Sequence, residues 1–181
     1  MVSRKAIQMS LYTQYIENHN FINPELIKQI KYAPGKASNY AGEQIEKTDF
    51  HIRKDRKGLM GEDYWQTFKR DVLNILYPQV MVNYYGFDNA KKMKWEVLDY
   101  WYQIYNKGSH HDWHLHNSCT FSNVYFVKLQ DKAAPTEFLG MSKMNATEGC
   151  LITWPSYMLH RAPFNESDER IIISFNVNVY E

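Results

Sequence analysis

The clearest pattern of hydrophobic and polar positions lies near the C-terminus of the chain. Between residues 170 and 179, the odd positions are all apolar and the even positions are mostly polar. This alternation predicts a β-strand with one face in the core and one polar face. Such a polar face is more often plain solvent surface, although in a barrel that holds a ligand it can point inward.

From Lys94 to the end of the chain, short runs of β-branched and aromatic residues recur between turn signals. This spacing is typical of an all-β sandwich or barrel. We therefore expect mostly β structure over residues 94–181. Residues 7–17 mix apolar and aromatic side chains without a clean period, which we interpret as a short strand or an extended arm.

Two stretches in the first half of the chain have the spacing of helices. One is expected over about residues 24–33, with Asn23 as its cap and Pro34 after its end. The other is expected over residues 62–77, and Pro78 would end or kink it. We interpret its apolar face as core rather than as a cofactor site. That face consists of Trp65, Phe68, Val72, Leu73, Ile75 and Leu76.

Residues 34–61 carry Gly, Lys, Asp and Arg with few large aliphatic residues, which predicts a long surface segment. Long loops in compact domains are usually lids or binding loops, so this segment could fold over a substrate. Residues 79–93 predict a helical turn and a loop. A length of 181 residues suits one domain, with residues 1–93 as helical and loop support for residues 94–181.

Charge and cysteine content exclude several classes of protein. Lys and Arg number 21 against 20 Asp and Glu, so the chain lacks the overall basic field that non-specific nucleic-acid binding needs. Cys119 and Cys150 are too few for a disulfide scaffold. The sequence has no apolar N-terminal stretch of signal-peptide or membrane-span length. We therefore expect a protein of the cytoplasm, either of a bacterium or of a phage-infected cell.

Histidine is concentrated in one part of the chain. Five of the seven histidines fall after residue 109, and four of these lie within seven positions. His114 and His116 would place two imidazoles at one end of a strand. His160, from a distant turn, can then close one face of a coordination sphere, as non-haem iron sites require. The pair formed by His110 and Asp112 is a rival with more usual ligand types, and it stays open at this point.

Five segments of the C-terminal part, taken in order, resemble the Fe(II)- and 2-oxoglutarate-dependent oxygenases. The likeness is greatest to the prolyl-hydroxylase-like branch and to small oxygenases of bacteria and their phages that carry His-X-His. It implies a double-stranded β-helix, a cupin-like jelly roll, over residues 94–181 with the N-terminal helices packed on one sheet. The expected class is thus mostly β with flanking helices (α+β). The segments are Tyr105-Asn-Lys-Gly108, His114-Leu-His116, Ser122-Asn-Val-Tyr-Phe126, Trp154-Pro-Ser-Tyr-Met-Leu-His160, and Glu169-Arg170 with Ser174-Phe-Asn176.

By this resemblance, Fe(II) is held by His114, His116 and His160. The family usually has Asp or Glu as its second ligand, so a third imidazole is a departure. Arg170 would pair with the far carboxylate of 2-oxoglutarate, because a planar guanidinium suits a carboxylate, and the hydroxyl of Ser174 would assist it. Further residues that would line the co-substrate pocket are Tyr105, Ser122, Val124 and Phe126. The last of these stands where prolyl hydroxylases often have a co-substrate-binding tyrosine.

The activity implied by the resemblance couples decarboxylation of 2-oxoglutarate to succinate, with O2, to hydroxylation of a substrate C–H bond. The substrate would be a peptide, a protein or a small molecule, and a prolyl or other amino-acid residue is the leading candidate. Membranes and nucleic acids are not expected partners, whereas a homodimer stays open. Two alternatives remain. One is a three-histidine cupin-type dioxygenase that does not use 2-oxoglutarate, and the other is a non-catalytic jelly-roll binding module.

Overall fold

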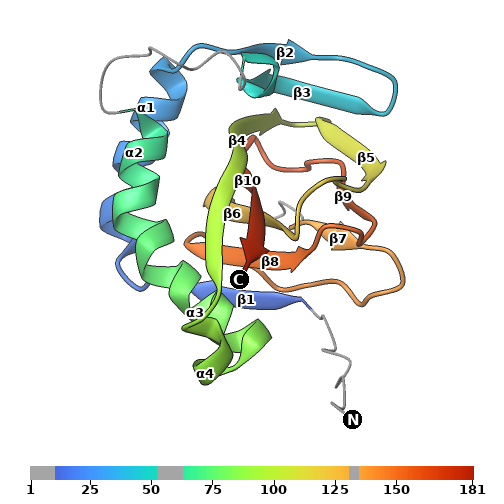
Figure 1. Ribbon diagram of the computed structural model, residues 1–181. Coiled ribbons are helices and arrows are strands. Elements are labelled where there is room, and N and C mark those ends of the chain that lie inside the picture. The colour runs from blue at the N-terminus through green and yellow to red at the C-terminus, as the bar shows by residue number, and fades with distance from the viewer. Residues whose placement is uncertain (1–10, 53–62, 131–134) are drawn as a thin grey trace.

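The protein is built on an antiparallel β-sheet that curls on itself (Figure 1). The computed structural model describes residues 11–52, 63–130 and 135–181. Within these ranges the sheet has ten strands: nine follow the order β1-β8-β6-β10-β4-β3-β5-β9-β7, and the tenth, β2, pairs with β3. The strands are β1 (Tyr12–Tyr15), β2 (Lys36–Ser38), β3 (Glu43–Thr48), β4 (Lys94–Asn106), β5 (His110–His114), β6 (Phe121–Leu129), β7 (Glu137–Phe138), β8 (Cys150–Pro155), β9 (His160–Ala162) and β10 (Glu169–Tyr180).

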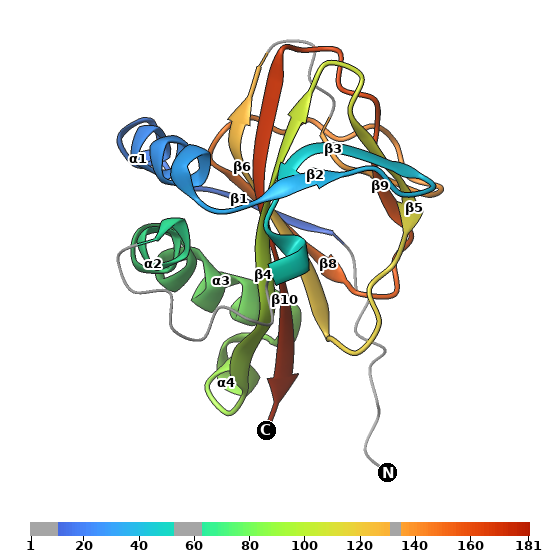
Figure 2. The ribbon, with the colours of Figure 1, turned by 90° about the horizontal axis from the view of Figure 1, so that it is seen from above.

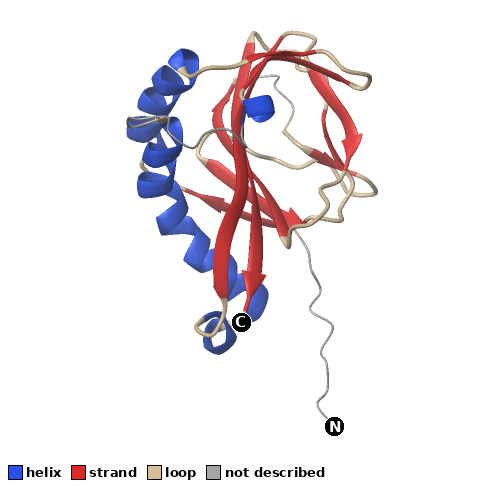
Figure 3. Ribbon diagram, turned by 45° about the horizontal axis from the view of Figure 1, so that its top comes forward, coloured by secondary structure: helices blue, strands red, loops and turns tan. Residues whose placement is uncertain are grey.

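The main helices lie together on one side of β4, β6 and β10, and the remaining strands curl away on the other side (Figure 2, Figure 3). This arrangement confirms the predicted jelly-roll core with helices packed on one sheet. None of the helices in the described ranges has the length and apolar character needed to span a bilayer. The helices are α1 (His19–Tyr32), the 3-10 turn η1 (Phe50–Ile52), α2 (Tyr64–Phe68), the π-turn η2 (Lys69–Leu73), α3 (Asn74–Tyr85) and α4 (Phe87–Ala90).

The alternating pattern of the last strand has a clear physical cause in the structure. The odd residues from Ile171 to Val177 are fully buried in the core between the sheet and the helices. The even residues face the inside of the curl, where Ile172, Ser174 and Asn176 line a cavity. The interpretation of this polar face as solvent surface is therefore wrong, and the inward orientation is correct.

The segment expected to be a long surface loop is largely a β-hairpin. Strands β2 and β3 occupy residues 36–38 and 43–48, whereas residues 53–61 lie outside the described ranges. Strand β3 pairs with β4 on one side and β5 on the other, so it connects the two parts of the curled sheet. Ile45 and Thr48 are buried there. The N-terminal part thus supplies strands as well as helical support, and the hairpin is a wall of the cavity.

The first helix begins earlier than expected, and Asn23 is not its N-cap. Helix α1 starts at His19, and the Asn23 side chain is buried within it. Its amide donates to the carbonyl of Val127 at 2.8 Å, and its oxygen accepts from the hydroxyl of Tyr125 at 2.8 Å. Asn23 therefore fixes α1 to β6 by satisfying buried polar groups of the sheet.

The second helix also extends beyond its predicted end. Pro78 lies inside α3, which continues to Tyr85 and stops at Gly86, where φ is +76°. A glycine suits that backbone conformation. Ile75 does not belong to the apolar face, since its side chain is 48% exposed. The buried residues of α3 are instead Leu76, Tyr77, Val80, Met81 and Tyr84. One residue along a helix turns the side chain by about 100°, so neighbouring apolar residues can differ in burial.

The aromatic core between helix and sheet should carry much of the stability. Phe68 is fully buried, and its ring centroid lies 5.6 Å from that of Phe175 on β10. Phe68→Ala is expected to lower the free energy of unfolding by about 3–5 kcal/mol, because it leaves a cavity. Urea denaturation measures the change. Phe21→Ala on α1 is the matched control, since Phe21 is 80% exposed. Equal effects of the two substitutions would contradict this packing.

Candidate metal centre

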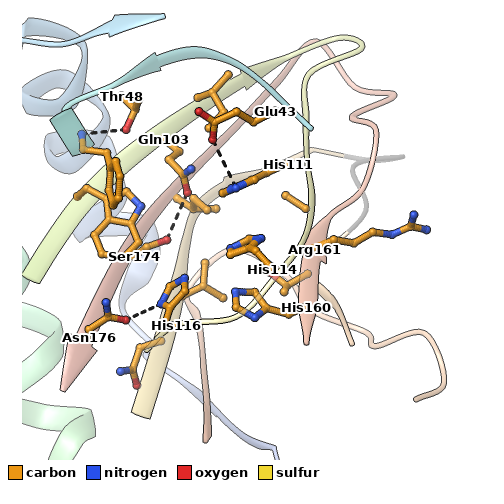
Figure 4. A pocket seen from close by; sticks show the side chains of 18 of the residues that line it. Glu43, Thr48, Gln103, His111, His114, His116, His160, Arg161, Ser174 and Asn176 are labelled. Atoms are coloured by element: carbon orange, nitrogen blue, oxygen red, sulfur yellow. Dashed lines mark hydrogen bonds and ion pairs between the residues drawn. The ribbon is translucent and has the colours of Figure 1, made fainter. Parts of the chain in front are cut away.

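The strands bring three histidines together at one end of the curled sheet. His114 ends β5 and His160 begins β9, and the two residues are direct partners across these strands. His116 follows in the chain after β5, and its backbone N–H donates to the carbonyl of Ser156 at 3.1 Å. One nitrogen from each imidazole lies within 4.8 Å of those of the other two. Figure 4 shows the three rings gathered at the cavity.

Backbone carbonyls orient two of these imidazoles. The Nδ1 atom of His114 lies 2.7 Å from the carbonyl oxygen of Asp112, and that of His160 lies 3.0 Å from the carbonyl oxygen of Met158. A carbonyl oxygen only accepts, so the proton of each neutral ring is placed on Nδ1. The Nε2 lone pair of each ring is then available to a metal, which is the usual arrangement of metal-binding histidines.

Two side chains orient the third imidazole. The Nδ1 atom of His116 lies 2.7 Å from Oδ1 of Asn176 and 2.9 Å from Oγ of Ser122. The amide oxygen of Asn176 accepts the Nδ1 proton, which again leaves Nε2 for a metal. Asn176 lies on β10 and Ser122 on β6, and the two residues are partners across these strands. The inner face of the sheet thus holds His116 in place.

Burial keeps the histidines neutral. Removal from water is the largest cause that lowers the pKa of His160 to about 2 and that of His116 to about 4, and neighbouring imidazoles lower both further. The pKa of His114 is also lowered, mainly by burial. Neutral imidazoles are the form that binds a metal ion, so protons compete little for this site near neutral pH.

A cavity of about 390 Å³ adjoins the histidines, and all three line it. Its inner wall comes from β4, β6 and β10, with Gln103, Val124 and Ser174 among its residues. The Ser174 hydroxyl lies 3.5 Å from Oε1 of Gln103. The cavity is therefore lined mainly by polar and charged side chains, with apolar side chains such as Val124 and Ile172 between them.

Solved structures with this architecture are numerous. An oxidoreductase of the 2OG-Fe(II) oxygenase family from Burkholderia pseudomallei matches with a TM-score of 0.68 and 13% identity, over 93% of this chain and 85% of that chain. The chain has the fold of the 2OG-Fe(II) oxygenases. The viral collagen prolyl hydroxylase of Paramecium bursaria Chlorella virus-1 matches with a TM-score of 0.60 and 14% identity, over 92% and 95% of the two chains.

A third structure with this oxygenase fold contains a bound peptide. The prolyl hydroxylase of Trichoplax adhaerens, in complex with a fragment of the hypoxia inducible factor oxygen degradation domain, has a TM-score of 0.64 and 11% identity. That match covers 93% of this chain and 84% of the other. No family model and no curated protein matches the sequence.

The donor set fits the iron of such oxygenases. Three oriented imidazoles meet at the cavity wall, and nitrogen ligands of this kind suit Fe(II) and related transition metals. The cavity beside them leaves space for a ligand on the open side. Asp112, considered as a rival ligand, is exposed and is not part of the convergent group. Asp112 orients His114 through its backbone carbonyl rather than through its carboxylate.

The other two histidines of the cluster lie beside the centre. The ring of His111 stacks on that of His114, with centroids 3.8 Å apart and an interplanar angle of 12°. Its Nε2 atom lies 3.4 Å from a carboxylate oxygen of Glu43, which comes from the β2–β3 hairpin (Figure 4). His110 instead packs against Phe164, with ring centroids 4.2 Å apart. Of these two histidines, His111 is among the residues that line the cavity and His110 is not.

Arg170 lies on the inner face of β10 but deeper than the cavity wall. It is 1% exposed, and its Cζ atom lies 4.1 Å from the ring centroid of Tyr105. Burial lowers the pKa of Arg170, and the Tyr105 hydroxyl opposes that effect. Tyr105 lines the cavity, whereas Arg170 is not among the described residues that do. The Tyr105 ring therefore contacts both the cavity and the buried guanidinium of Arg170.

The remaining predicted pocket residues divide into two groups. Val124 and Ser174 line the cavity beside the histidines. Ser122 supports His116, and Phe126 is buried in the smaller apolar cluster of the sheet. Cys119 is half-buried with its Sγ atom 3.9 Å from Oγ of Ser122, and it lies outside the convergent histidine group.

Several residues of the site were not assigned a role from the sequence. Asn176 was visible as one of the polar positions of the last strand, but its contact with His116 joins residues far apart in the chain. Strands β3, β4 and β8 contribute further wall residues that no local pattern marks. They include Glu43, Gln103 and Trp154.

The contact between Asn176 and His116 allows a direct test of whether the orientation of the His116 ring matters for metal binding. Asn176→Ala removes the amide oxygen that holds the His116 ring, so metal affinity is expected to fall by about 10–100-fold. Competition with a chelator for Zn(II) or Co(II) measures this change. Asn178→Ala, two residues further along the same strand, is the matched control and should bind metal like the unmodified protein. Equal affinities of the two variants would contradict the assigned role.

Proposed function

We propose that the protein is an Fe(II)- and 2-oxoglutarate-dependent oxygenase that hydroxylates an amino-acid side chain. One observation carries this proposal. The three imidazoles converge on one side of a cavity, each with Nδ1 held by an oxygen and Nε2 left for a metal. The oxygenase fold supports the same reaction class.

Iron with 2-oxoglutarate and O2 supplies the oxidation, in which 2-oxoglutarate loses CO2 to give succinate and a substrate C–H bond gains an oxygen atom. The protein's own residues bind the metal and the co-substrate, orient them, and exclude water. His114, His116 and His160 hold the metal from one side. Asn176 and Ser122 keep the His116 ring from rotating. Strands of the curled sheet enclose the opposite side, where the co-substrate would lie.

For 2-oxoglutarate we propose an anchor at the deep end of the cavity. Arg170 supplies the positive charge, and Tyr105 and Ser174 supply hydroxyls on the same inner face. A planar guanidinium can bind a carboxylate with two parallel hydrogen bonds. In the described conformation the Tyr105 ring lies over the guanidinium, so binding requires either a shift of that ring or a contact at its edge.

For the main substrate we propose a peptidyl or free amino-acid residue, with proline as the first candidate. Two structural neighbours are prolyl hydroxylases, and one of them contains a peptide. In this chain the β2–β3 hairpin forms one wall of the cavity and carries the carboxylate of Glu43. An extended chain bound along this wall would place a side chain toward the histidines.

A screen of succinate release tests the proposed function. Purified protein with Fe(II), ascorbate and 2-oxoglutarate is offered proline-containing peptides, free amino acids and nucleosides. We expect stimulation of succinate formation by a peptide or an amino acid, with a product heavier by one oxygen atom. Stimulation by a nucleoside alone would contradict the proposed substrate class. If no succinate forms with any of the compounds, and none forms without an added compound, the result would favour the non-catalytic binding module.

The three-histidine dioxygenase is the second candidate, because the ligand set lacks a carboxylate. Such an enzyme would share the metal centre and would have no use for a 2-oxo acid. Anaerobic binding of 2-oxoglutarate to the Fe(II) protein separates the two candidates, since only the proposed oxygenase binds it.

A further inference from the structure

Glu43 places a carboxylate on the cavity wall beside the metal centre. Its side chain is 18% exposed, so a molecule in the cavity can reach it, and it points toward His111 and His114 (Figure 4). The ring of His111 stacks on that of His114, which puts the carboxylate one ring away from a metal ligand. Burial lowers the pKa of His114, and the charge of Glu43 opposes that effect across the same short distance.

The β2–β3 hairpin holds this carboxylate in a fixed position. Glu43 is the direct strand partner of His111, and the carbonyl of Gly42 accepts from the N–H of Asp112 at 2.6 Å. The hydroxyl of Ser38 donates to Oε1 of Glu43, and Nε2 of His111 lies 3.4 Å from Oε2. A carboxylate has about four lone-pair sites. Both oxygens are therefore oriented by the protein, and both can still accept from a bound ligand.

No permanent positive charge balances Glu43 within the part of the chain that the structure describes. His111 is the basic side chain in ion-pair contact with it there. Burial is the largest cause that lowers the pKa of His111 to about 3, so this ring is neutral near neutral pH. Arg161, the only Lys or Arg among the described wall residues, is paired with Glu137 at 2.7 Å. A partly buried carboxylate attracts a cation more strongly than one in open water.

We propose that Glu43 binds a protonated nitrogen group of the main substrate. This inference rests on the proposed function and narrows its substrate to a compound with a positive charge on the hairpin side of the metal centre. Such a charge has two sources, the free amine of an amino acid and the side-chain ammonium of a basic residue in a peptide. Hydrogen bonds between charged partners are about twice as strong as neutral ones, so Glu43 selects the substrate and positions it against the histidines.

Matched pairs of compounds test the inference by calorimetric titration into the anaerobic Fe(II) protein with 2-oxoglutarate. One pair is L-proline and N-acetyl-L-proline, whose nitrogen is neutral. The other is a tripeptide with blocked ends and a central lysine, and the same tripeptide with norleucine. We expect the charged member of at least one pair to bind about tenfold or more tightly than its neutral partner. The pair that responds identifies the source of the charge.

Glu43→Gln removes the charge and keeps the shape of the side chain, including an oxygen that can accept from Ser38 or His111. Affinity for the charged compound should fall by about ten- to a hundredfold, whereas affinity for its neutral partner and for 2-oxoglutarate should stay the same. Glu46→Gln is the matched control, because Glu46 lies on the same strand, is exposed and is not among the cavity wall residues. A purely structural role of Glu43 would weaken both members of a pair alike.

The outcomes distinguish this inference from the proposed function. If the unmodified protein binds 2-oxoglutarate but prefers no charged compound, or if Glu43→Gln keeps the preference, the inference is overturned and the proposed function stands. Loss of the preference in Asp99→Asn but not in Glu43→Gln would also overturn it, since Asp99 is the other carboxylate of the described cavity wall. If the unmodified protein does not bind 2-oxoglutarate, the proposed function fails and the inference fails with it.

Discussion

Replacing His160 with alanine is expected to abolish metal binding and all turnover while leaving the fold intact. His160 is 4% exposed, is the strand partner of His114, and supplies one of the three convergent ligand atoms. Loss of a direct ligand should exceed the effect of losing a supporting hydrogen bond, which is about 10–100-fold. Calorimetric titration with Zn(II) or Co(II) measures it, and circular dichroism checks the fold.

His110→Ala is the matched control for this experiment. His110 belongs to the same cluster in the sequence, but its ring packs on Phe164 and does not line the cavity. We expect the His110 variant to bind metal normally. Metal binding by His160→Ala with little loss of affinity would show that the ion is held elsewhere. Equal losses in both variants would point to damage of the fold instead of removal of a ligand.

Replacing Arg170 has the second large expected effect. If Arg170 pairs with the far carboxylate of 2-oxoglutarate, its loss leaves a charge unpaired in a largely dry site. Such a loss costs ~2–5 kcal/mol, which corresponds to about a thirty- to several-thousand-fold weaker affinity. Metal binding should persist, because the convergent group consists of His114, His116 and His160 and does not include Arg170. Ser174→Ala should weaken binding in the same direction but less, since it removes a neutral hydrogen bond.

Arg170 also fills space in the core, so the experiment needs variants that separate charge from packing. Arg170→Lys retains the charge without the planar fork, and we expect it to bind 2-oxoglutarate better than Arg170→Ala and less well than the unmodified protein. Arg161→Ala tests the other arginine of the site, because Arg161 also lines the cavity but is paired with Glu137 at 2.7 Å and extends away from the histidines (Figure 4). A larger effect at Arg161 than at Arg170 would place the anchor at the cavity mouth.

The sequence predicted the strands whose hydrophobic pattern is long enough to be unambiguous. The alternation of β10 extends over most of a twelve-residue strand, and the change of spacing at Lys94 coincides with the first residue of β4. The alternation alone could not decide which face lies inside. That choice depended on the likeness of Arg170 and Ser174 to an oxygenase pattern, and the structure shows that the polar face lines the cavity.

The β2–β3 hairpin could not be predicted for a physical reason. Strand β3 has only Ile45 as a large aliphatic residue among six positions. Its sequence therefore shows no alternation of apolar and polar residues that would predict a strand. Its pairing with β4 and β5 joins distant parts of the chain. The support of His116 by Asn176 was hidden for the same reason, since sixty positions separate the two residues. Local patterns do not report such contacts.

Anaerobic titration of 2-oxoglutarate into the Fe(II)-loaded protein tests the central claim most directly. We expect a weak visible charge-transfer band to grow and saturate with the unmodified protein. The band should be absent with His160→Ala, which has no metal to bind the co-substrate, and should need far more 2-oxoglutarate with Arg170→Ala. A protein that holds Fe(II) through the three histidines and yet gives no band and no binding at any concentration of 2-oxoglutarate would contradict the account.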